Sequence, residues 1–516
     1  MTEYVGSLLS AGDAQRLREA FEAASYTSAG LAGRIGAPAV AGLERGDPSG
    51  TLLAGGDETR MGTLLRVFVQ GRGVSAQELA AALAPLPLAS ALAAGLIAPA
   101  ETGQVRARVQ LLPYQDRWFL ADPPFSGRTQ PSLDHVIGLS TYPATLAAAA
   151  MDHPVSTALD VCTGSGVQAL HLARRADHVT ATDLNPRALR FAATTAALAG
   201  HRWELLPGDL LAPVAGRRFD LVVANPPFIV KPGTVDYLYR DSGLENHVLA
   251  SSLVQSAPRV LTDGGYLQYL SAFLHRSGQD WREQATGWVQ GTDLDLYAIQ
   301  LGVCDPRTYV RTWSGGHDSD PAEETAWLNW LTDQDIDAVG WGLVTVRNAH
   351  RDIPHRDAED LSNTAVRAPD IATWFRNRDW LHTHTDQLLD LPYQANPTTR
   401  LTQHGHLDDH QWAIAKQFIT TTSPTGLCRI DEINQITVDL LARCTLTTTP
   451  RALLPDLAHD NDLDIAELTR ILPTAITSMI EHTILTPAPA PPIPAPTSPT
   501  GHTLADPAPP ATLTPT

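Results

Sequence analysis

Short apolar segments alternate with helical segments through the middle of the chain, and this order limits the fold more than any other feature. Consecutive parallel strands need a crossover, usually a helix, so the alternation predicts a doubly wound α/β sheet. Two more apolar segments follow the first five, with acidic, Trp-containing helical sequence between them. The expected strands are residues 156–161, 178–183, 202–209, 221–225, 264–271, 295–302 and 339–348.

The predicted sheet accounts for less than half of the chain. With 516 residues and 43% hydrophobic residues, the chain is too long for a single core, so several domains are expected. Residues 1–133 predict a helical domain whose second half, with helices followed by two alternating strands, resembles a winged helix. The sheet domain occupies residues 134–350. Residues 351–485 predict a C-terminal α+β domain with a second winged-helix-like pattern, and residues 486–516 predict a disordered Pro/Thr-rich tail.

The charge of the chain bears on the class of partner. The formal net charge is -19 at pH 7, and no region is basic. Phosphate contacts supply much of nucleic-acid affinity, so this charge weighs against a dedicated nucleic-acid-binding protein, although a local basic groove can lie within a negative total. In the winged-helix-like part, residues 75–95 are apolar and nearly uncharged, which favours packing on a domain or a protein substrate.

The cysteines and the N-terminal sequence bear on location. The 4 cysteines are scattered without CxxC spacing, which is typical of reduced thiols and not of a disulfide framework or a zinc site. The N-terminal residues include early acidic side chains and no apolar signal-peptide core, and no apolar stretch is long enough to span a bilayer. We therefore expect a cytoplasmic protein without a membrane segment.

A turn of small residues follows the first strand. The strand ends at residues 160–161 (DV), and residues 163–166 (TGSG) precede a helix. Glycines let the backbone approach a ligand, and the free N–H groups of a helix start can bind a carboxylate or phosphate. Alone, this turn is a weak signal, because dinucleotide-binding folds use a related turn with a third glycine, which Ala169 could replace.

Acidic residues end the next two strands. Asp183 ends the second, where its carboxylate could accept hydrogen bonds from both ribose hydroxyls of an adenosine; an ordinary helix cap is the alternative. The third ends near Asp209 and Leu210, where an adenine edge and face would lie. Carboxyl ends of parallel strands share one edge of the sheet, where open α/β folds bind ligands, so these turns together predict one nucleoside site.

The fourth strand stops at Asn225, Pro226, Pro227 and Phe228. The nitrogen of an amide or an exocyclic base amine is a poor nucleophile because its lone pair is delocalised. The Asn225 side-chain oxygen and the Pro226 carbonyl could accept hydrogen bonds from its N–H groups and direct its lone pair. Pro227 would stiffen the turn and Phe228 could stack on a planar group. The alternative is a strand-ending turn with a core phenylalanine, which the preceding loops disfavour.

These segments resemble the S-adenosylmethionine-dependent amino-methyltransferases with a (D/N)PP(Y/F) motif, which include release-factor glutamine methyltransferases and methyltransferases of adenine N6 or guanine N2. The resemblance covers about residues 134–350. It implies the seven-stranded class I methyltransferase sheet and S-adenosyl-L-methionine as cofactor, and it departs at Cys162, where many relatives carry Gly or Pro.

The same resemblance assigns roles to individual residues. Gly164 and Gly166 would approach the methionine part of the cofactor, Asp160 its amino group and Asp183 its ribose. The implied catalytic residues are Asn225, Pro226, Pro227 and Phe228. The implied cofactor-binding residues are Asp160, Thr163, Gly164, Ser165, Gly166, Asp183, Leu184, Asp209, Leu210 and Asn225.

Three hypotheses for the function remain at this point. A protein glutamine side chain is the favoured methyl acceptor, since the flanking domains are acidic. An RNA or DNA base is the alternative, supported by the winged-helix-like patterns and opposed by the charge. A fold that binds without catalysis is the third, which the intact motif disfavours. The sequence leaves the oligomeric state open.

Two other segments carry candidate side chains. Residues 382–387 and 404–410 contain a His-rich set that could hold a metal, but we expect solvated loops and no metal site, because no regular helix or strand is expected to present these side chains together. Residues 237–247, with Arg240 and Asp241, could form a lid, contact the substrate or merely cap the surface. The His-rich set comprises His382, His384, His404, His406, Asp409 and His410.

Overall fold

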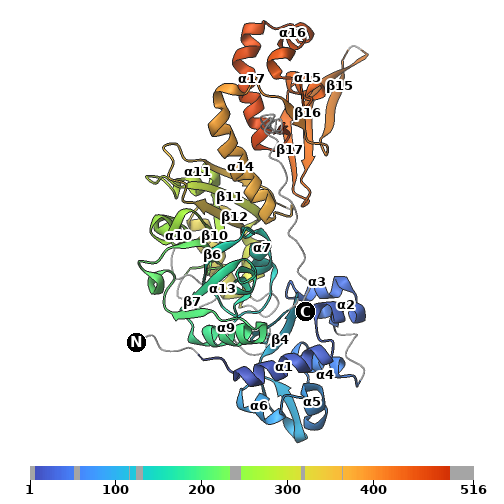
Figure 1. The fold of residues 1–516 in the computed structure, drawn as a ribbon, viewed down its shortest axis with the longest axis vertical. Helices are drawn as coiled ribbons and strands as arrows, with labels where there is room; N and C mark the ends of the chain where they lie inside the picture. The colour runs from blue at the N-terminus through green and yellow to red at the C-terminus, as the bar shows by residue number, and fades with distance from the viewer. Residues whose placement is uncertain are drawn as a thin grey trace, which may run out of the picture. The chain divides into compact units, whose positions relative to one another are not determined.

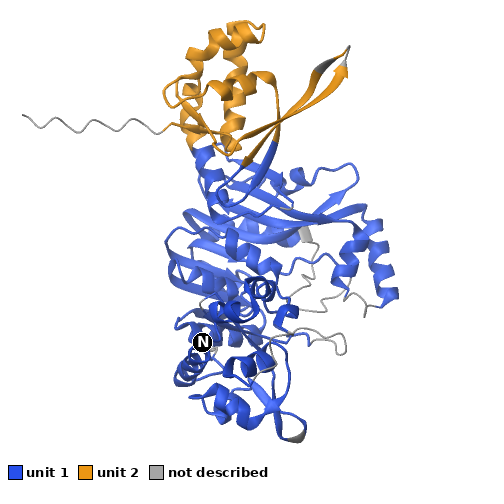
Figure 2. Ribbon diagram, turned by 90° about the vertical axis from the view of Figure 1, so that its right-hand side faces the viewer, with its two compact units in different colours: residues 1–379, 422–430 blue, residues 380–421, 431–516 orange. Residues whose placement is uncertain are grey.

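A computed structural model gives the fold of the chain. It describes residues 6–51, 58–115, 117–123, 132–232, 246–314, 320–362, 364–408 and 410–488. The chain forms two compact units, of which the first comprises residues 1–379 with 422–430 and the second residues 380–421 with 431–516 (Figure 2). The predicted lid segment with Arg240 and Asp241, and the predicted tail from residue 489 onward, lie outside the described residues.

A large mixed sheet forms the centre of the first unit. Its strand order is β8, β7, β6, β9, β10, β12, β11 and β13. The strands β8, β7, β6, β9 and β10 pair in parallel, whereas β12 is antiparallel to both β10 and β11. The strand bounds are β6 (Val155–Val161), β7 (Ala176–Asp183), β8 (Glu204–Pro207), β9 (Phe219–Ala224), β10 (Leu261–Arg276), β11 (Asp295–Cys304), β12 (Ile336–Arg347) and β13 (Arg356–Asp360).

The predicted count of seven strands was wrong, because β13 adds an eighth at the edge. Its sequence RDAED is almost entirely charged, and Ala358 is its only buried residue, so it lacks the apolar pattern that predicts a strand. It pairs in parallel with β11. An edge strand with one covered position needs little apolar sequence, which is why the pattern missed it.

Helices cover both faces of the sheet because strand residues alternate between two cores. Val223 and Leu270 belong to a cluster that also takes residues from α7, α8, α12, α13 and α14, whereas Val222 and Leu267 belong to a cluster with α10 and α11. The helix bounds are α7 (Thr141–Ala149), α8 (Val167–Leu172), α9 (Pro186–Ala199), α10 (Asn246–Val260), α11 (Trp281–Gly287), α12 (Pro306–Trp313), α13 (Pro321–Asp333) and α14 (Ala368–His384).

The N-terminal residues pack on α9 through a third core, and Figure 1 shows α1 beside that helix. Ser10 caps α1 by accepting a hydrogen bond from the Asp13 N–H at 3.0 Å. A three-stranded sheet has the order β1, β3, β2, and β4 and β5 form a separate hairpin. The bounds are α1 (Ala11–Ala23), α2 (Ser28–Ile35), α3 (Ala37–Leu43), α4 (Arg60–Phe68), β1 (Val74–Ser75), α5 (Ala76–Leu83), α6 (Leu88–Ala93), β2 (Ile97–Pro99), β3 (Gln104–Ala107), β4 (Gln110–Tyr114) and β5 (Arg117–Ala121).

The C-terminal elements combine short sheets with helices. Three helices pack with two small sheets, one of β15, β16 and β17 and one of β14 and β18. The core of this part of the chain includes Leu457, Leu472 and Ile476. The bounds are β14 (Tyr393–Ala395), β15 (Arg400–Asp408), β16 (Gln411–Thr422), β17 (Cys428–Ile433), α15 (Gln435–Arg443), α16 (Pro450–Asp460), α17 (Ile465–Glu481) and β18 (Leu485–Pro487).

The expectation of loops for the His-rich segments was wrong. His382 and His384 lie in the last turn of α14, and His404 and His406 lie on β15. Within the part of the chain that the structure describes, no group of three or more His, Cys, Asp or Glu side chains could hold a metal ion. None of the four cysteines forms a disulfide. Among the described helices, none is both long and apolar enough to cross a membrane.

Candidate functional site

The ends of four parallel strands bring the predicted site residues to one edge of the sheet. Val161 at the end of β6 lies level with Thr182 on β7 and with Ala224 on β9. Asp183 lies level with Pro207 of β8. The turn after β6, the loop after Asp183, the loop after β8 and the turn from Asn225 onward therefore all start at the same edge.

The turn after β6 is held by hydrogen bonds to the neighbouring strands. The Thr163 hydroxyl donates to Asp160 Oδ2 at 2.6 Å, and the Thr163 N–H donates to the Thr182 carbonyl at 3.0 Å. Gly164 and Gly166 have φ values of 54° and 86°, in the left-handed region that favours glycine. A Cβ at Gly164 would meet no atom within 4 Å, so the space beside this backbone is open to a ligand.

Asp160 is fully buried, and only one of its carboxylate oxygens is satisfied. Oδ2 accepts hydrogen bonds from Thr163 and from the Ala169 N–H at 2.9 Å. Among the described residues, Oδ1 has no hydrogen-bond partner. Burial raises the pKa of Asp160 to about 7. The hydrogen bonds from Thr163 and from the Ala169 N–H lower this pKa, but burial has the larger effect. A buried acceptor oxygen without a partner fits a bound ammonium group, because such a group would supply the missing donor and the missing charge.

Asp183 organises the loops on either side of it. Its Oδ2 accepts from the Gly164 N–H at 2.8 Å and its Oδ1 from the Asn185 N–H at 2.8 Å. Burial raises its pKa, and the backbone hydrogen bonds lower it. Asn185, and not Asp183, caps α9, by accepting from the Arg187 N–H at 2.9 Å. Each carboxylate oxygen of Asp183 retains a further lone pair that could accept a ribose hydroxyl.

The residues that follow β7 and β8 expose both apolar and acidic side chains at this edge. Leu184 is 55% exposed, an unusual position for a large apolar side chain directly after a strand. Asp209 is exposed, and Leu210 has a positive φ of 44° with its carbonyl accepting from the Thr182 hydroxyl at 2.9 Å. The two loops are joined by a hydrogen bond from the Gly208 N–H to the Asp183 carbonyl at 3.0 Å, and an exposed leucine and an exposed carboxylate on such loops would suit the face and amino edge of an adenine.

Cys162 occupies a strained backbone position. Its φ is 58°, which costs an L-residue with a side chain roughly 1–2 kcal/mol relative to glycine. Burial raises the pKa of its thiol well above the ordinary value.

The turn Asn225–Phe228 follows β9 without regular structure. Asn225 is partly exposed, and its side chain makes no hydrogen bond with any residue that the structure describes. Pro226 is buried, and the Phe228 side chain is 9% exposed. The chain beyond is fixed through Val230, whose N–H donates to the Tyr309 hydroxyl at 2.9 Å and whose carbonyl accepts from Trp327 Nε1 at 3.0 Å.

An aromatic cluster beside this turn was not predicted. Tyr142 contacts the Phe228 ring edge-on at a centroid distance of 5.3 Å, and it also contacts Trp313 at 5.5 Å and Trp341 at 4.8 Å. These four residues come from α7, the turn after β9, α12 and β12, so no spacing in the sequence links them. The only indication of this cluster in the sequence was the tryptophan content of the segment after β11. We call Tyr142, Phe228, Trp313 and Trp341 the aromatic wall.

The two glycines of the turn allow a matched test. A Cβ at Gly166 would lie 2.6 Å from Cζ3 of Trp203, whereas a Cβ at Gly164 would meet nothing. We expect Gly164→Ala to lower the free energy of unfolding by about 1–2 kcal/mol, because of the positive φ alone. Gly166→Ala should cost about 1–3 kcal/mol more, because the indole must move. Thermal unfolding of both variants measures this difference, and equal midpoints would show that Trp203 does not pack on Gly166.

Comparisons with known families agree with this site. Residues 144–275 match the family described as Methyltransferase small domain. Residues 23–108 and 372–487 match two families described as domains of unknown function, DUF7059 and DUF7782. The family match includes β6 to β9 and the turn from Asn225 to Phe228.

Curated relatives point in the same direction. A ribosomal protein uL3 glutamine methyltransferase of Bradyrhizobium diazoefficiens is 34% identical over 171 residues, which are 30% of this chain and 54% of the relative. A release factor glutamine methyltransferase of Geobacter sulfurreducens is 34% identical over 121 residues, 21% of this chain and 43% of the relative. The chain thus spans about half or less of the relatives it matches. Over that span, the resemblance to glutamine methyltransferases is confirmed.

Solved structures give weaker matches. A ribosomal protein L11 methylase of Lactobacillus delbrueckii subsp. bulgaricus matches 40% of this chain and 77% of its own, with 19% identity and a TM-score of 0.25. A methyltransferase of Pyrococcus furiosus matches 42% of this chain and 87% of its own, with 14% identity and a TM-score of 0.26.

Proposed function

We propose that the chain is an S-adenosylmethionine-dependent N-methyltransferase that acts on a glutamine side chain of a protein. The observation that carries the proposal is the position of Asn225. It lies at the same sheet edge as Asp160 and Asp183, and its side chain has no hydrogen bond to the described part of the chain. The sheet is then that of class I methyltransferases, extended by β13 at its edge.

The residues of the turns after β6, β7 and β8 would hold the cofactor. Asp160 would accept a hydrogen bond from its ammonium group through the unpartnered Oδ1. Asp183 would bind the ribose, and Leu184 with Leu210 would lie against the adenine, with Asp209 at its amino group. Thr163, Gly164, Ser165 and Gly166 form the turn that approaches the methionine part. Bound there, the cofactor supplies a methyl group on a positively charged sulfur.

Asn225 and Pro226 would orient the acceptor nitrogen. Each offers one carbonyl-type oxygen, so together they accept hydrogen bonds from both N–H groups of a carboxamide. This favours a geometry in which the nitrogen lone pair points at the methyl group. The nitrogen forms a bond to the methyl carbon while the carbon–sulfur bond breaks with its electrons on sulfur, and the nitrogen then releases one proton. No strong base is needed, since that nitrogen is cationic before it loses the proton.

Pro227 and Phe228 would shape the site. Pro227 stiffens the turn, and the anchored Val230 limits its movement further. Because Phe228 is 9% exposed, any stacking on a planar acceptor would use the small accessible part of its ring. The partly exposed Tyr142 of the aromatic wall offers further apolar surface beside it.

The choice of a protein acceptor is supported by the relatives, whose names specify glutamine of ribosomal protein uL3 or of release factors. A soluble protein of the translation apparatus would place the enzyme in the cytoplasm. An RNA or DNA base is the second candidate. It is supported by the element order α4, β1, α5, α6, β2 and β3, which resembles that of a winged helix. We also propose domain boundaries near residues 133, 350 and 485.

Radiolabelling of an extract distinguishes the two candidates. Extract from a strain lacking this protein is incubated with the purified chain and S-adenosylmethionine carrying a tritiated methyl group, and portions are then treated with protease or nuclease. We expect acid-precipitable label that survives nuclease and is lost with protease. Label lost only with nuclease would select a nucleic-acid base instead. Extract from the wild-type strain, in which the sites are already methylated, is the control and should take up little label.

A further inference from the structure

A cavity lies between α3, β4 and the segment of residues 135–139 that leads into α7. Its volume is about 230 Å³. Gly46 and Ile137 line this cavity and are exposed, so it opens to solvent. Sites for drug-sized ligands have volumes of about 300–1,000 Å³, so this cavity has the size for a smaller molecule or for a single side chain.

The walls of the cavity are apolar and buried. Leu43 at the end of α3, Leu112 of β4 and Leu139 before α7 line it, and they are 3%, 3% and 5% exposed. The chain on either side is closely packed, because a Cβ at Gly46 would lie 2.5 Å from the Leu139 carbonyl oxygen. These walls are therefore preformed and suit an apolar group.

The charged and titratable groups of the cavity favour a neutral occupant. Asp122 lines it, but both of its carboxylate oxygens accept hydrogen bonds from the Arg187 guanidinium, and Oδ2 also accepts from the Val136 N–H at 2.9 Å. Burial lowers the pKa of His135, so its imidazole is neutral near pH 7. An ionic ligand would find no unpaired opposite charge on these two side chains.

Gln110 is a buried polar residue of the cavity whose side chain lacks a partner. It is 9% exposed, and its carboxamide makes no hydrogen bond with any residue that the structure describes. Buried polar side chains are nearly always hydrogen-bonded. The other buried glutamines of the described chain follow this rule, since each makes at least one side-chain hydrogen bond. They are Gln168, Gln268, Gln300 and Gln417.

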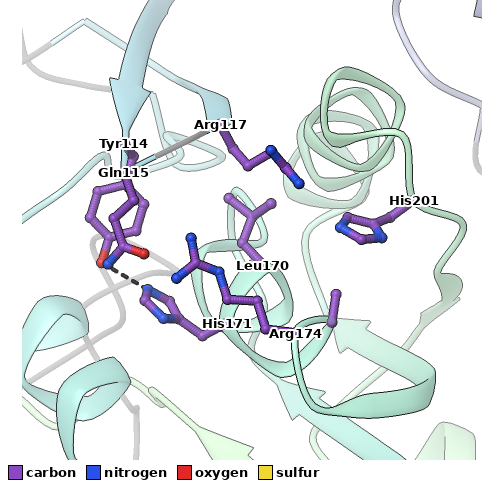
Figure 3. A pocket seen from close by; sticks show the side chains of 8 residues that line it. Tyr114, Gln115, Arg117, Leu170, His171, Arg174 and His201 are labelled. Atoms are coloured by element: carbon purple, nitrogen blue, oxygen red, sulfur yellow. Dashed lines mark hydrogen bonds between the residues drawn. The ribbon is translucent and has the colours of Figure 1, made fainter. Parts of the chain in front are cut away.

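A second cavity, at the other end of β4, shows the usual arrangement of buried polar groups. There the Tyr114 hydroxyl lies 2.8 Å from His171 Nε2, so the two groups are paired with each other (Figure 3). Gln110 has no such neighbour among the described residues. Its carboxamide can therefore bind a group that enters the cavity.

We propose that the cavity beside Gln110 binds an uncharged amide group attached to a small apolar body. A carboxamide offers N–H donors and a carbonyl acceptor side by side, so a second amide can form two hydrogen bonds with it at once. The leucine walls suit the apolar body, and the pairing of Asp122 with Arg187 disfavours an ion. A free small molecule can supply this chemistry, and so can a protein segment through its backbone.

The cavity is separate from the methyl-transfer site but shares a segment with it. None of its lining residues belongs to the predicted catalytic or cofactor-binding set. The carbonyl of Ile137 accepts a hydrogen bond from the Ser165 hydroxyl at 3.3 Å, so an occupant would contact the segment that reaches the cofactor turn. Binding in this cavity does not depend on the proposed function.

Binding of three matched probes to the full-length chain tests the proposal. Isovaleramide carries an amide on a branched apolar body, and isovalerate is its charged counterpart of nearly the same shape. N-acetyl-L-leucine N-methylamide carries the same body on a peptide backbone. Titrations followed by saturation-transfer NMR give the dissociation constants. The variant Gln110→Leu removes the carboxamide, and the control Gln15→Leu replaces an exposed glutamine that does not line the cavity.

We expect at least one amide probe to bind the wild type, and isovalerate to bind at least about tenfold more weakly. Gln110→Leu should lose about tenfold or more in affinity for the amide, since two hydrogen bonds account for about that factor. Gln15→Leu should bind within about threefold of the wild type. Binding of isovaleramide identifies a free small molecule as a source, and binding of the N-methylamide alone identifies a protein segment.

Thermal unfolding of the free variants gives a second measurement. Gln110→Leu should raise the unfolding midpoint, because the substitution removes a buried amide that lacks a partner. Both variants should keep the wild-type affinity for S-adenosylhomocysteine. A lower midpoint in Gln110→Leu would show that the carboxamide serves the fold and would overturn the proposal. So would the absence of binding by both amide probes, equal binding of isovalerate, or equal affinities of Gln110→Leu and Gln15→Leu.

Discussion

Asn225→Ala is expected to slow methyl transfer by about 10²–10³-fold while the affinity for S-adenosylhomocysteine stays at the wild-type value. The variant removes one of two acceptors that orient the nitrogen, and the Pro226 carbonyl alone cannot fix both N–H groups. Because the Asn225 side chain makes no hydrogen bond to the described residues, its loss should leave the turn folded. Initial rates with extract as substrate and calorimetry with S-adenosylhomocysteine measure the two quantities.

The conservative variant Asn225→Asp is the matched control. It keeps an acceptor oxygen at the same place, and the motif of the resembling methyltransferases admits aspartate there. We expect this variant to retain methyl-transfer activity within about tenfold of the wild type, because the substitution replaces the NH2 group of the side chain and keeps its acceptor oxygen. Wild-type activity in Asn225→Ala would contradict the assigned role. Loss of cofactor binding in that variant would show instead that Asn225 supports the cofactor pocket.

Asp160→Asn is expected to weaken the binding of S-adenosylhomocysteine by about 10–100-fold at pH 8, because an amide replaces a carboxylate opposite an ammonium group. It should also remove the pH dependence of binding. In the wild type the pKa of Asp160 is raised to about 7, so the carboxyl is largely protonated below that pH. The ammonium group needs the ionised form, so the affinity of the wild type should rise from pH 5.5 to pH 7 and then level off.

Proton release supports the same assignment. Below pH 7, binding of the ammonium group should displace the Asp160 proton, so calorimetry in two buffers of different ionisation enthalpy should show release of up to one proton at pH 6. Asp160→Asn should release none. Asp177→Asn, an exposed aspartate outside the site, is the control and should behave as the wild type. A wild-type affinity that falls between pH 5.5 and pH 7 would contradict the role of Asp160.

The sheet and its functional edge could be predicted because their signals are local. Short strand-forming segments closed by acidic or small residues located Asp183 and Asn225 at this edge, whereas the role of Asp160 came only from the resemblance to known methyltransferases. β13 could not be predicted, since a charged edge strand has no apolar segment of this kind. From the sequence, Asp183 was given as an alternative cap of α9, whereas Asn185 caps that helix. The two residues could not be told apart because both accept backbone hydrogen bonds at the same helix start.

The parts that depend on tertiary contacts were out of reach. Tyr142, Trp313 and Trp341 meet around Phe228 only after four elements have packed, and nothing in their separate segments indicates this. The pocket lined by Arg117 of the β4–β5 hairpin and by Arg174 after α8 likewise joins segments that are far apart in the sequence. Histidines in α14 and β15 were expected in loops, because polar sequence on an exposed helix end or strand resembles loop sequence.

Mass spectrometry of the labelled extract tests the central claim most directly. Extract from a strain lacking this protein is incubated with the chain and S-adenosylmethionine carrying a deuterated methyl group, and both peptides and nucleosides are analysed. The account predicts one deuterated methyl group on the side-chain nitrogen of a glutamine in a discrete protein, absent with Asn225→Ala. A deuterated methyl group on an adenine or guanine, on another amino acid, or on no macromolecule would contradict it.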